Sequence, residues 1–230
     1  GSNPILFYPA LWYDIGPETQ AARNALFTLR SDLYAEAYPQ AITRWSREHN
    51  TIATGHQDNE EIVNPVGTSG DLMKCFRYLE MPGIDKIGTT RPTITRPAEK
   101  FYKIVASAAY NWDHSLVMAE TYGLMEGLSM DSLRSVAIDQ FIKGVNWFIP
   151  HAAWYNDKKV TFKPELSARN PHYADSLYDF TTFLARLQYM LQNNARFVTD
   201  VAVLYPIHTM QGDHYFDGPI RPYEGGVKIP

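Results

Sequence analysis

Cysteine is almost absent from the sequence, and other marks of specialised protein classes are missing with it. Cys75 is the single cysteine, which excludes an internal disulfide and a zinc cluster built from cysteines. No apolar run approaches the roughly 18 residues of a transmembrane helix. The 21 basic and 25 acidic residues leave a net charge of −4, which argues against a nucleic-acid partner and against an anionic membrane surface.

Short catalytic signatures are missing as well. The sequence contains no glycine-rich phosphate loop, no GxSxG nucleophile elbow, no HExxH zinc motif and no CxxC pair. Its 45% hydrophobic and 20% charged residues are an ordinary globular composition, in a chain long enough to bury a core without disulfides. Gly1-Ser2 resembles a cloning scar, and we expect both ends to be cuts through a longer protein.

Short apolar runs recur along the chain with helical patterns between them. They lie at residues 51–54, 84–87, 116–119 and 147–149. Their spacing of roughly thirty residues is the size of one strand–helix unit. Strands that alternate with helices form a parallel sheet. The sequence therefore predicts an α/β protein with four parallel strands.

The helical patterns give the boundaries of the other elements. A helix is expected from Glu18 to His49, with a kink or break at Pro39. The others are expected around Phe101–Trp112 with Thr95 as N-cap, from an Asp131 cap to Gly144, and over Tyr173–Leu191. A fifth apolar run covers Val201–Tyr205, and we expect no helix from Asp200 onward.

The number of strand–helix units sets the expected fold. A complete (β/α)8 barrel needs about 250 residues, so four units account for half of one. We predict that residues 1–199 form the C-terminal half of a TIM-type barrel, namely helix four followed by strands five to eight. Residues 200–230 are predicted to begin a following domain or linker.

Polar residues at the ends of the predicted strands are the candidate site, because active sites of parallel α/β folds lie at the carboxyl ends of strands. Glu120 directly follows the third apolar run and is the predicted catalytic carboxylate, acting as nucleophile or general base. The alternative is a surface glutamate that caps the next turn. The residues predicted to bind substrate are His56, Asp58, Glu61, Tyr122, His151, Trp154 and Tyr155.

These predicted contacts differ in chemistry. The two histidines and the acidic residues Asp58 and Glu61 would hold sugar hydroxyls. Tyr122, Trp154 and Tyr155 would sit on one rim and stack on the apolar faces of sugar rings. The alternatives are that the acidic loop is solvated surface, that the histidines are packing residues and that the aromatic residues cover a core.

Three segments carry a resemblance to a known family. They are Asp32–Tyr38 with Trp45, Ser107–Tyr110 leading into Leu116–Glu120, and Asp139–Asn146 running into Phe148–His151. Over most of residues 10 to 205 the chain resembles the catalytic barrel of the α-L-rhamnosidase glycoside hydrolases of family 106 and their uncharacterised relatives.

The resemblance implies a catalytic barrel within a large secreted or periplasmic enzyme that cleaves glycosidic bonds in polysaccharides, α-L-rhamnosides among them. It implies that Glu120 matches a catalytic carboxylate, the general base if the mechanism is inverting. It also implies a calcium ion in the whole enzyme, for which no residue of this sequence can be named. The family's general acid belongs to a strand that we expect to precede this chain, so the fragment alone is expected to be inactive.

Two other functions stay open at this point. A metal-dependent TIM-barrel hydrolase would use His56, Asp58, Glu120 and His151 as ligands, although ligands on separate strands have no diagnostic spacing. A non-catalytic carbohydrate-binding remnant would bind sugar without turning it over.

The predicted half barrel leads to a first testable expectation. Half a barrel exposes two sheet edges that closure would hide, so we predict that the chain pairs with a second copy. Multi-angle light scattering at micromolar concentration should give twice the mass of the 26.2 kDa chain. A clean monomer would contradict the prediction.

Overall fold

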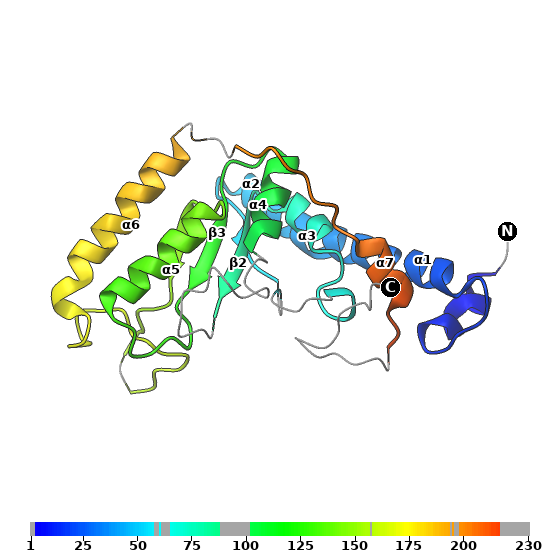
Figure 1. The fold of residues 1–230 in the computed structure, drawn as a ribbon, viewed down its shortest axis with the longest axis horizontal. Coiled ribbons are helices and arrows are strands. Elements are labelled where there is room, and N and C mark those ends of the chain that lie inside the picture. Colours follow the sequence, from blue (N-terminus) through cyan, green and yellow to red (C-terminus); the bar gives the residue numbers. More distant parts are fainter. Residues whose placement is uncertain are drawn as a thin grey trace. The chain divides into compact units, whose positions relative to one another are not determined.

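The computed structural model describes residues 3–57, 60, 65–87, 102–156, 158–193, 195 and 198–216. Within these ranges the chain is an α/β protein with a four-stranded parallel sheet and seven α-helices (Figure 1). Its contacts divide it into two compact units. The helical unit is Gly1–Ala53, Gln57–Leu79 and Thr199–Pro230, and the sheet unit is Thr54–His56 and Glu80–Val198.

The helical unit contains a long helix whose hydrogen-bond pattern changes at a proline. Its α-helices are α1 (Thr19–Ala35), α2 (Ala41–Glu48), α3 (Leu72–Tyr78) and α7 (Ile207–Asp213), with short 3₁₀ helices at Pro4–Leu11 and Pro65–Gly67. One π-helical turn, Glu36–Gln40, joins α1 to α2 and contains Pro39. Proline has no N–H for the helical hydrogen-bond ladder, so the ladder is interrupted there. The helix predicted from Glu18 to His49, with its break at Pro39, is confirmed.

The core of the helical unit joins the two ends of the sequence. Phe27 on α1 packs with Ile207 and Met210 on α7 and with Val66, and Leu11 and Tyr205 lie against this cluster. The expectation of no helix after Asp200 is therefore wrong. Ile207 and Met210 are three residues apart, which places both on the face of α7 that meets α1.

The segment before α7 is not a strand. Val201, Val203 and Leu204 are exposed, and no residue of the fifth apolar run lies in a strand. Tyr205 at its end is the residue of this run that packs against the core cluster. The predicted following domain or linker at 200–230 stays a prediction about the whole protein. Of this segment, the described α7 packs against α1 in the helical unit.

Helix α3 holds the single cysteine. Its N-terminus is capped by Asp71, whose carboxylate accepts a hydrogen bond from the Met73 amide at 3.1 Å. Cys75 is fully buried, and burial raises the pKa of its thiol to about 12. The thiol therefore stays protonated and inaccessible while this unit is folded.

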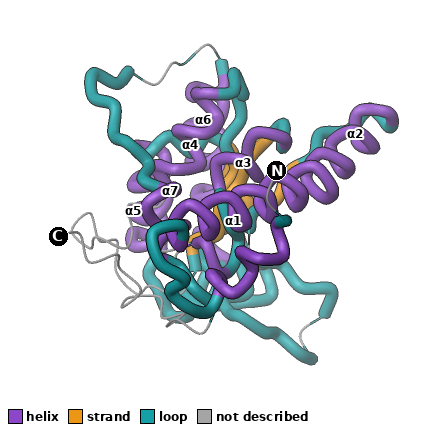
Figure 2. The backbone as a smooth tube through the Cα atoms, turned by 90° about the vertical axis from the view of Figure 1, so that its right-hand side faces the viewer, coloured by secondary structure: helices purple, strands orange, loops and turns teal. Residues whose placement is uncertain are grey.

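The sheet unit contains four parallel strands in sequence order. Figure 2 draws the strands in orange among the purple helices. They are β1 (Thr54–Gly55), β2 (Met81–Lys86), β3 (Met118–Thr121) and β4 (Trp147–Pro150). Its helices are α4 (Tyr102–Asn111), α5 (Met130–Ile142) and α6 (Leu177–Gln192), with a 3₁₀ turn at Ala174–Ser176. The predicted parallel sheet is confirmed, and a closed barrel is not formed by the described residues.

One helix start differs from its prediction. Ser129, not Asp131, caps α5, because the Ser129 hydroxyl accepts the Ser132 amide at 3.2 Å. Asp131 lies in the first turn instead, where its charge suits the positive end of the helix dipole.

The two faces of the sheet have different surroundings. Side chains alternate along a strand, so Thr121 and Glu120 point to opposite faces. The Thr121 hydroxyl donates to Gln140 of α5 at 3.2 Å, and Phe148 packs on Phe141 of α5, which identifies the helix-covered face. On the other face Trp147 and Ile149 remain 37% and 39% exposed. Glu120 shares this second, more open face.

A glycine allows β1 and β2 to approach each other. A Cβ atom at Gly83 would lie 2.7 Å from the Gly55 carbonyl oxygen and 2.3 Å from the end of the Met118 side chain. The Met118 methyl can move away, but the Gly55 carbonyl belongs to the neighbouring strand and cannot. The close spacing of β1 and β2 therefore depends on the absence of a side chain at position 83.

We predict that Gly83→Ala lowers the free energy of unfolding by about 1–3 kcal/mol through overpacking. Gly55→Ala is the matched control, since a Cβ there meets no atom within 4 Å. Chemical denaturation of both variants tests the prediction. Equal midpoints for the two variants would contradict it.

Candidate functional site

The carboxylate of Glu120 lies between two histidine rings. Its Oε2 is 3.3 Å from Nε2 of His56, and its Oε1 is 3.1 Å from Nδ1 of His151. The side chains are 35% exposed for Glu120, 30% for His56 and 16% for His151. The group is therefore partly shielded from water but still reachable from solvent.

The three residues meet because the carboxyl ends of β1, β3 and β4 lie at the same edge of the parallel sheet, with β2 between β1 and β3. Glu120 is the third residue of β3, His56 directly follows β1, and His151 directly follows β4. Parallel pairing aligns the carboxyl ends, and the His151 amide donates to the Thr121 carbonyl at 2.7 Å, one hydrogen bond beyond β4. The site is thus a product of the sheet topology.

The loop after β4 is held by a second set of hydrogen bonds. Leu166 N–H donates to the Ala152 carbonyl at 2.8 Å, which ties the chain beyond His151 to a later segment. The Arg169 guanidinium bonds both the Glu165 carboxylate and the Trp154 carbonyl. These contacts hold the backbone of the segment that carries His151 and Trp154 in place. They could not be predicted from the sequence, because Ala152, Leu166, Glu165 and Arg169 lie outside any regular helix or strand.

The hydrogen bonds to Glu120 determine the protonation of both rings. An ionised carboxylate can only accept, so each imidazole must donate to it. In its neutral form His151 then carries its proton on Nδ1 and a lone pair on Nε2. His56 carries its proton on Nε2.

Two buried polar atoms, one on His151 and one on the ring that contacts it, have no hydrogen-bond partner among the described residues. They are Nε2 of His151, which can accept, and Nε1 of Trp154, which can only donate. The two rings meet edge to face at 5.3 Å between centroids. Buried polar groups are normally satisfied, so this pair offers one acceptor and one donor to a bound group.

A second carboxylate stands on the neighbouring strand. Asp85 of β2 is in register with Glu120 of β3, so both side chains project from the same face of the sheet. Adjacent strands lie about 4.8 Å apart, which brings the two acidic side chains close together. The sequence showed Asp85 within an apolar run but not this register, which only the fold supplies.

The remaining predicted contacts are distributed differently. Tyr122 is a correction: it is not on a rim but fully buried, and its hydroxyl donates to the Leu133 carbonyl at 2.8 Å. Burial also raises the pKa of this phenol well above its ordinary value. Tyr155 is 99% exposed and so fully in solvent. Asp58 and Glu61 lie outside the described residues.

Within the described ranges, no three histidine, cysteine, aspartate or glutamate side chains form a group that could hold a metal ion. The described residues therefore provide no set of ligands that can be assigned to the calcium ion that the resemblance implies. In the same part of the chain, every helix is too short or too polar to cross a membrane.

The protonation pattern can be tested by NMR. At about pH 8, where an ordinary histidine is neutral, ¹H–¹⁵N spectra should show His151 protonated on Nδ1 and His56 on Nε2. Glu120→Gln introduces an amide donor, so one of the two rings must become an acceptor and change its tautomer. Glu126→Gln is the control, since its side chain is 64% exposed and pairs with Lys163 away from the two histidines. A wild-type His151 protonated on Nε2 would contradict the assignment.

Comparison with known proteins gives one structural relationship. No protein-family model and no curated protein sequence matches the chain. A rhamnosidase from Novosphingobium sp. PP1Y has a similar fold, with a TM-score of 0.59 and 18% identity, over 77% of this chain. This chain spans 18% of the length of that rhamnosidase. At this identity the likeness concerns the fold, and it is compatible with part of a TIM-type barrel.

Proposed function

We propose that this chain contributes the carboxylate side of a glycoside hydrolase active centre, with Glu120 as general base or nucleophile. The observation that carries the proposal is the position of Glu120 at the carboxyl end of a parallel strand, held by imidazoles from two other strand ends. Glycoside hydrolysis requires a carboxylate that activates water or attacks the anomeric carbon. The fold similarity to a rhamnosidase supports the same class of reaction.

The two histidines orient the carboxylate for this role. Oε1 of Glu120 is hydrogen-bonded to Nδ1 of His151, and Nε2 of His56 lies 3.3 Å from Oε2. These two contacts position the carboxylate and leave further lone pairs for a water molecule or an anomeric carbon. Asp85, on the same face, adds a second negative charge beside it. Such charge stabilises the positive character that develops on the sugar ring in an oxocarbenium-like transition state.

A sugar hydroxyl fits the unpaired atoms of His151 and Trp154. A hydroxyl both donates and accepts, so one group can donate to Nε2 of His151 and accept from Nε1 of Trp154. In this proposal Trp154 acts as a hydrogen-bond donor rather than as a stacking wall, and Tyr155 is the exposed ring that can stack on a sugar. An α-L-rhamnoside is the proposed substrate, on the strength of the resemblance and the fold similarity.

The wider context belongs to the same proposal. The chain would be the C-terminal half of the barrel of a longer secreted or periplasmic enzyme, whose general acid lies in another segment. Self-association of the chain, and a calcium ion in the whole enzyme, are likewise proposals.

We predict that Glu120→Gln lowers glycosidase activity of the natural protein that contains this chain by about 10²–10⁴-fold, the usual contribution of a positioned acid or base. Hydrolysis of an aryl α-L-rhamnoside measures it. Glu126→Gln is the control and should keep wild-type activity, because its carboxylate pairs with Lys163 in solvent.

Three results would contradict the proposal in different ways. Retention of most activity in Glu120→Gln would remove Glu120 from the mechanism. Sugar binding without turnover in the wild-type protein would favour the carbohydrate-binding remnant. Activity that is lost on chelation and restored by zinc would favour the metal-dependent hydrolase.

A further inference from the structure

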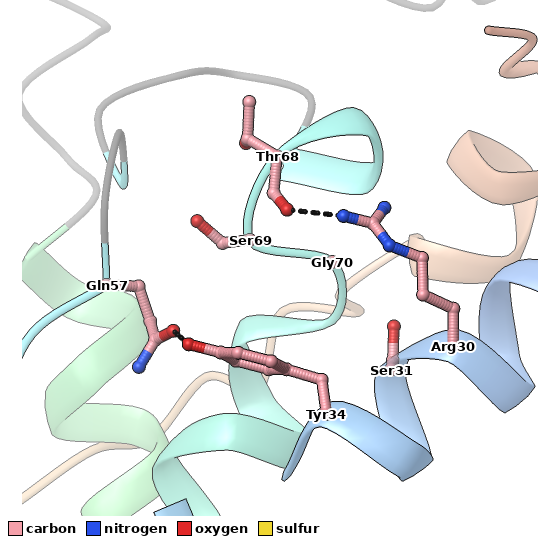
Figure 3. A pocket seen from close by; sticks show the side chains of 7 residues that line it. All are labelled: Arg30, Ser31, Tyr34, Gln57, Thr68, Ser69 and Gly70. Atoms are coloured by element: carbon pink, nitrogen blue, oxygen red, sulfur yellow. Dashed lines mark hydrogen bonds between the residues drawn. The ribbon is translucent and has the colours of Figure 1, made fainter. Parts of the chain in front are cut away.

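The helical unit contains a polar cavity whose lining residues play no part in the candidate site. The cavity has a volume of about 300 Å³ and lies between α1 and the segment that leads into α3 (Figure 3). Its size is at the lower end of pockets for small ligands. Arg30 and Tyr34 from α1 form one side, and Gln57, Thr68 and neighbouring residues form the other.

Arg30 brings a positive charge to this cavity without a carboxylate to balance it. Its Nη1 donates to the Val66 carbonyl at 2.7 Å, and its Nη2 donates to the Thr68 carbonyl at 2.8 Å. Both acceptors are uncharged main-chain groups, and no carboxylate of the described residues pairs with this guanidinium. The two bonds use two of its five N–H donors, so the group is held in place with donors to spare.

The rest of the lining is uncharged, so Arg30 supplies the only charge among the residues that line this cavity in the described part of the chain. Its other members are hydroxyl, amide and glycine residues, and none is acidic. The chain as a whole carries a net charge of −4, so an anion would be attracted here by the local arrangement and not by the protein's overall field. The residues of this cavity thus favour a negatively charged ligand.

The walls of the cavity are formed in advance of any ligand. The Tyr34 hydroxyl donates to Oε1 of Gln57 at 2.8 Å, and the Gln57 side chain is buried. Gly70 has a φ of +75°, and a Cβ there would lie 2.7 Å from the Ser31 hydroxyl oxygen. That hydroxyl is itself fixed, because it accepts the Asp71 amide at 3.1 Å. A preformed site spends little free energy on ordering when a ligand binds.

We propose that this cavity binds a small hydroxylated carboxylate of about the size of a monosaccharide acid, with its carboxylate on Arg30. The planar guanidinium matches a carboxylate in geometry, and charge-assisted bonds of this kind are roughly twice as strong as neutral ones. The hydroxyl groups of the lining suit a polyhydroxylated body, and the exposed Tyr34 ring gives it an apolar surface. A single cation suits a monoanion better than a phosphate dianion.

Binding of glucuronate, glucose and inorganic phosphate to the 230-residue chain tests the proposal by isothermal titration calorimetry. Glucose is the neutral counterpart of glucuronate, so it isolates the carboxylate. We expect saturable binding of glucuronate, at least tenfold weaker binding of glucose and of phosphate, and at least a tenfold loss of glucuronate affinity in Arg30→Gln. Arg44→Gln is the matched control, because it removes the same charge from an exposed position on α2 outside the cavity.

Each outcome decides the proposal, and none depends on glycosidase activity. Equal binding of glucose, equal binding of phosphate, or no binding of glucuronate would each overturn it. Loss of affinity in Arg44→Gln as large as in Arg30→Gln would overturn it too. Since Arg30→Gln removes two hydrogen bonds, ¹⁵N spectra of the wild-type chain give a second readout: glucuronate must shift the Ser69 and Gly70 amides, and unshifted amides would contradict the site.

Discussion

The register between β2, β3 and β4 is the constraint on which the candidate site depends. It sets Asp85, Glu120 and Ile149 side by side on one face and directs Thr121 toward α5 on the other. A slip of one residue would exchange the two faces and place a carboxylate among the buried residues of the helix-covered side. The packing of Phe148 and the hydrogen bond of Thr121 therefore protect the position of Glu120 without touching it.

The carboxylate of Glu120 is held by its two histidine neighbours and can still be reached from solvent. An imidazole lies beside each oxygen, while about a third of the side chain remains open to solvent. A reacting group must approach along the lone pairs that remain, which lie in the plane of the carboxylate. The geometry thus restricts the direction of attack as well as the position of the carboxylate.

The sequence predicted the strands well because apolar runs, spacing and strand ends are local signals. Glu120, His56 and His151 could be identified by their places after such runs. Tyr122 could not be placed, because the side chain of a residue one step beyond a strand can point either to the rim or into the core. Its buried hydroxyl bonds the Leu133 carbonyl of α5, a contact that depends on how that helix packs. Helix α7 was missed for a similar reason, since its two core residues are significant only when Phe27 lies opposite. The register of Asp85 and the support of Trp154 by Arg169 are likewise properties of the assembled fold.

The thiol of Cys75 can be used to detect local opening of the structure around it. It is the only thiol, it lies in the helical unit, and the sheet unit has none. Because the thiol is buried and its pKa is raised to about 12, it reacts as a thiolate only after the helices around it separate. The rate at which an alkylating reagent modifies the folded protein therefore reports the openings that expose Cys75 in the helical unit, whereas the sheet unit has no thiol to be modified.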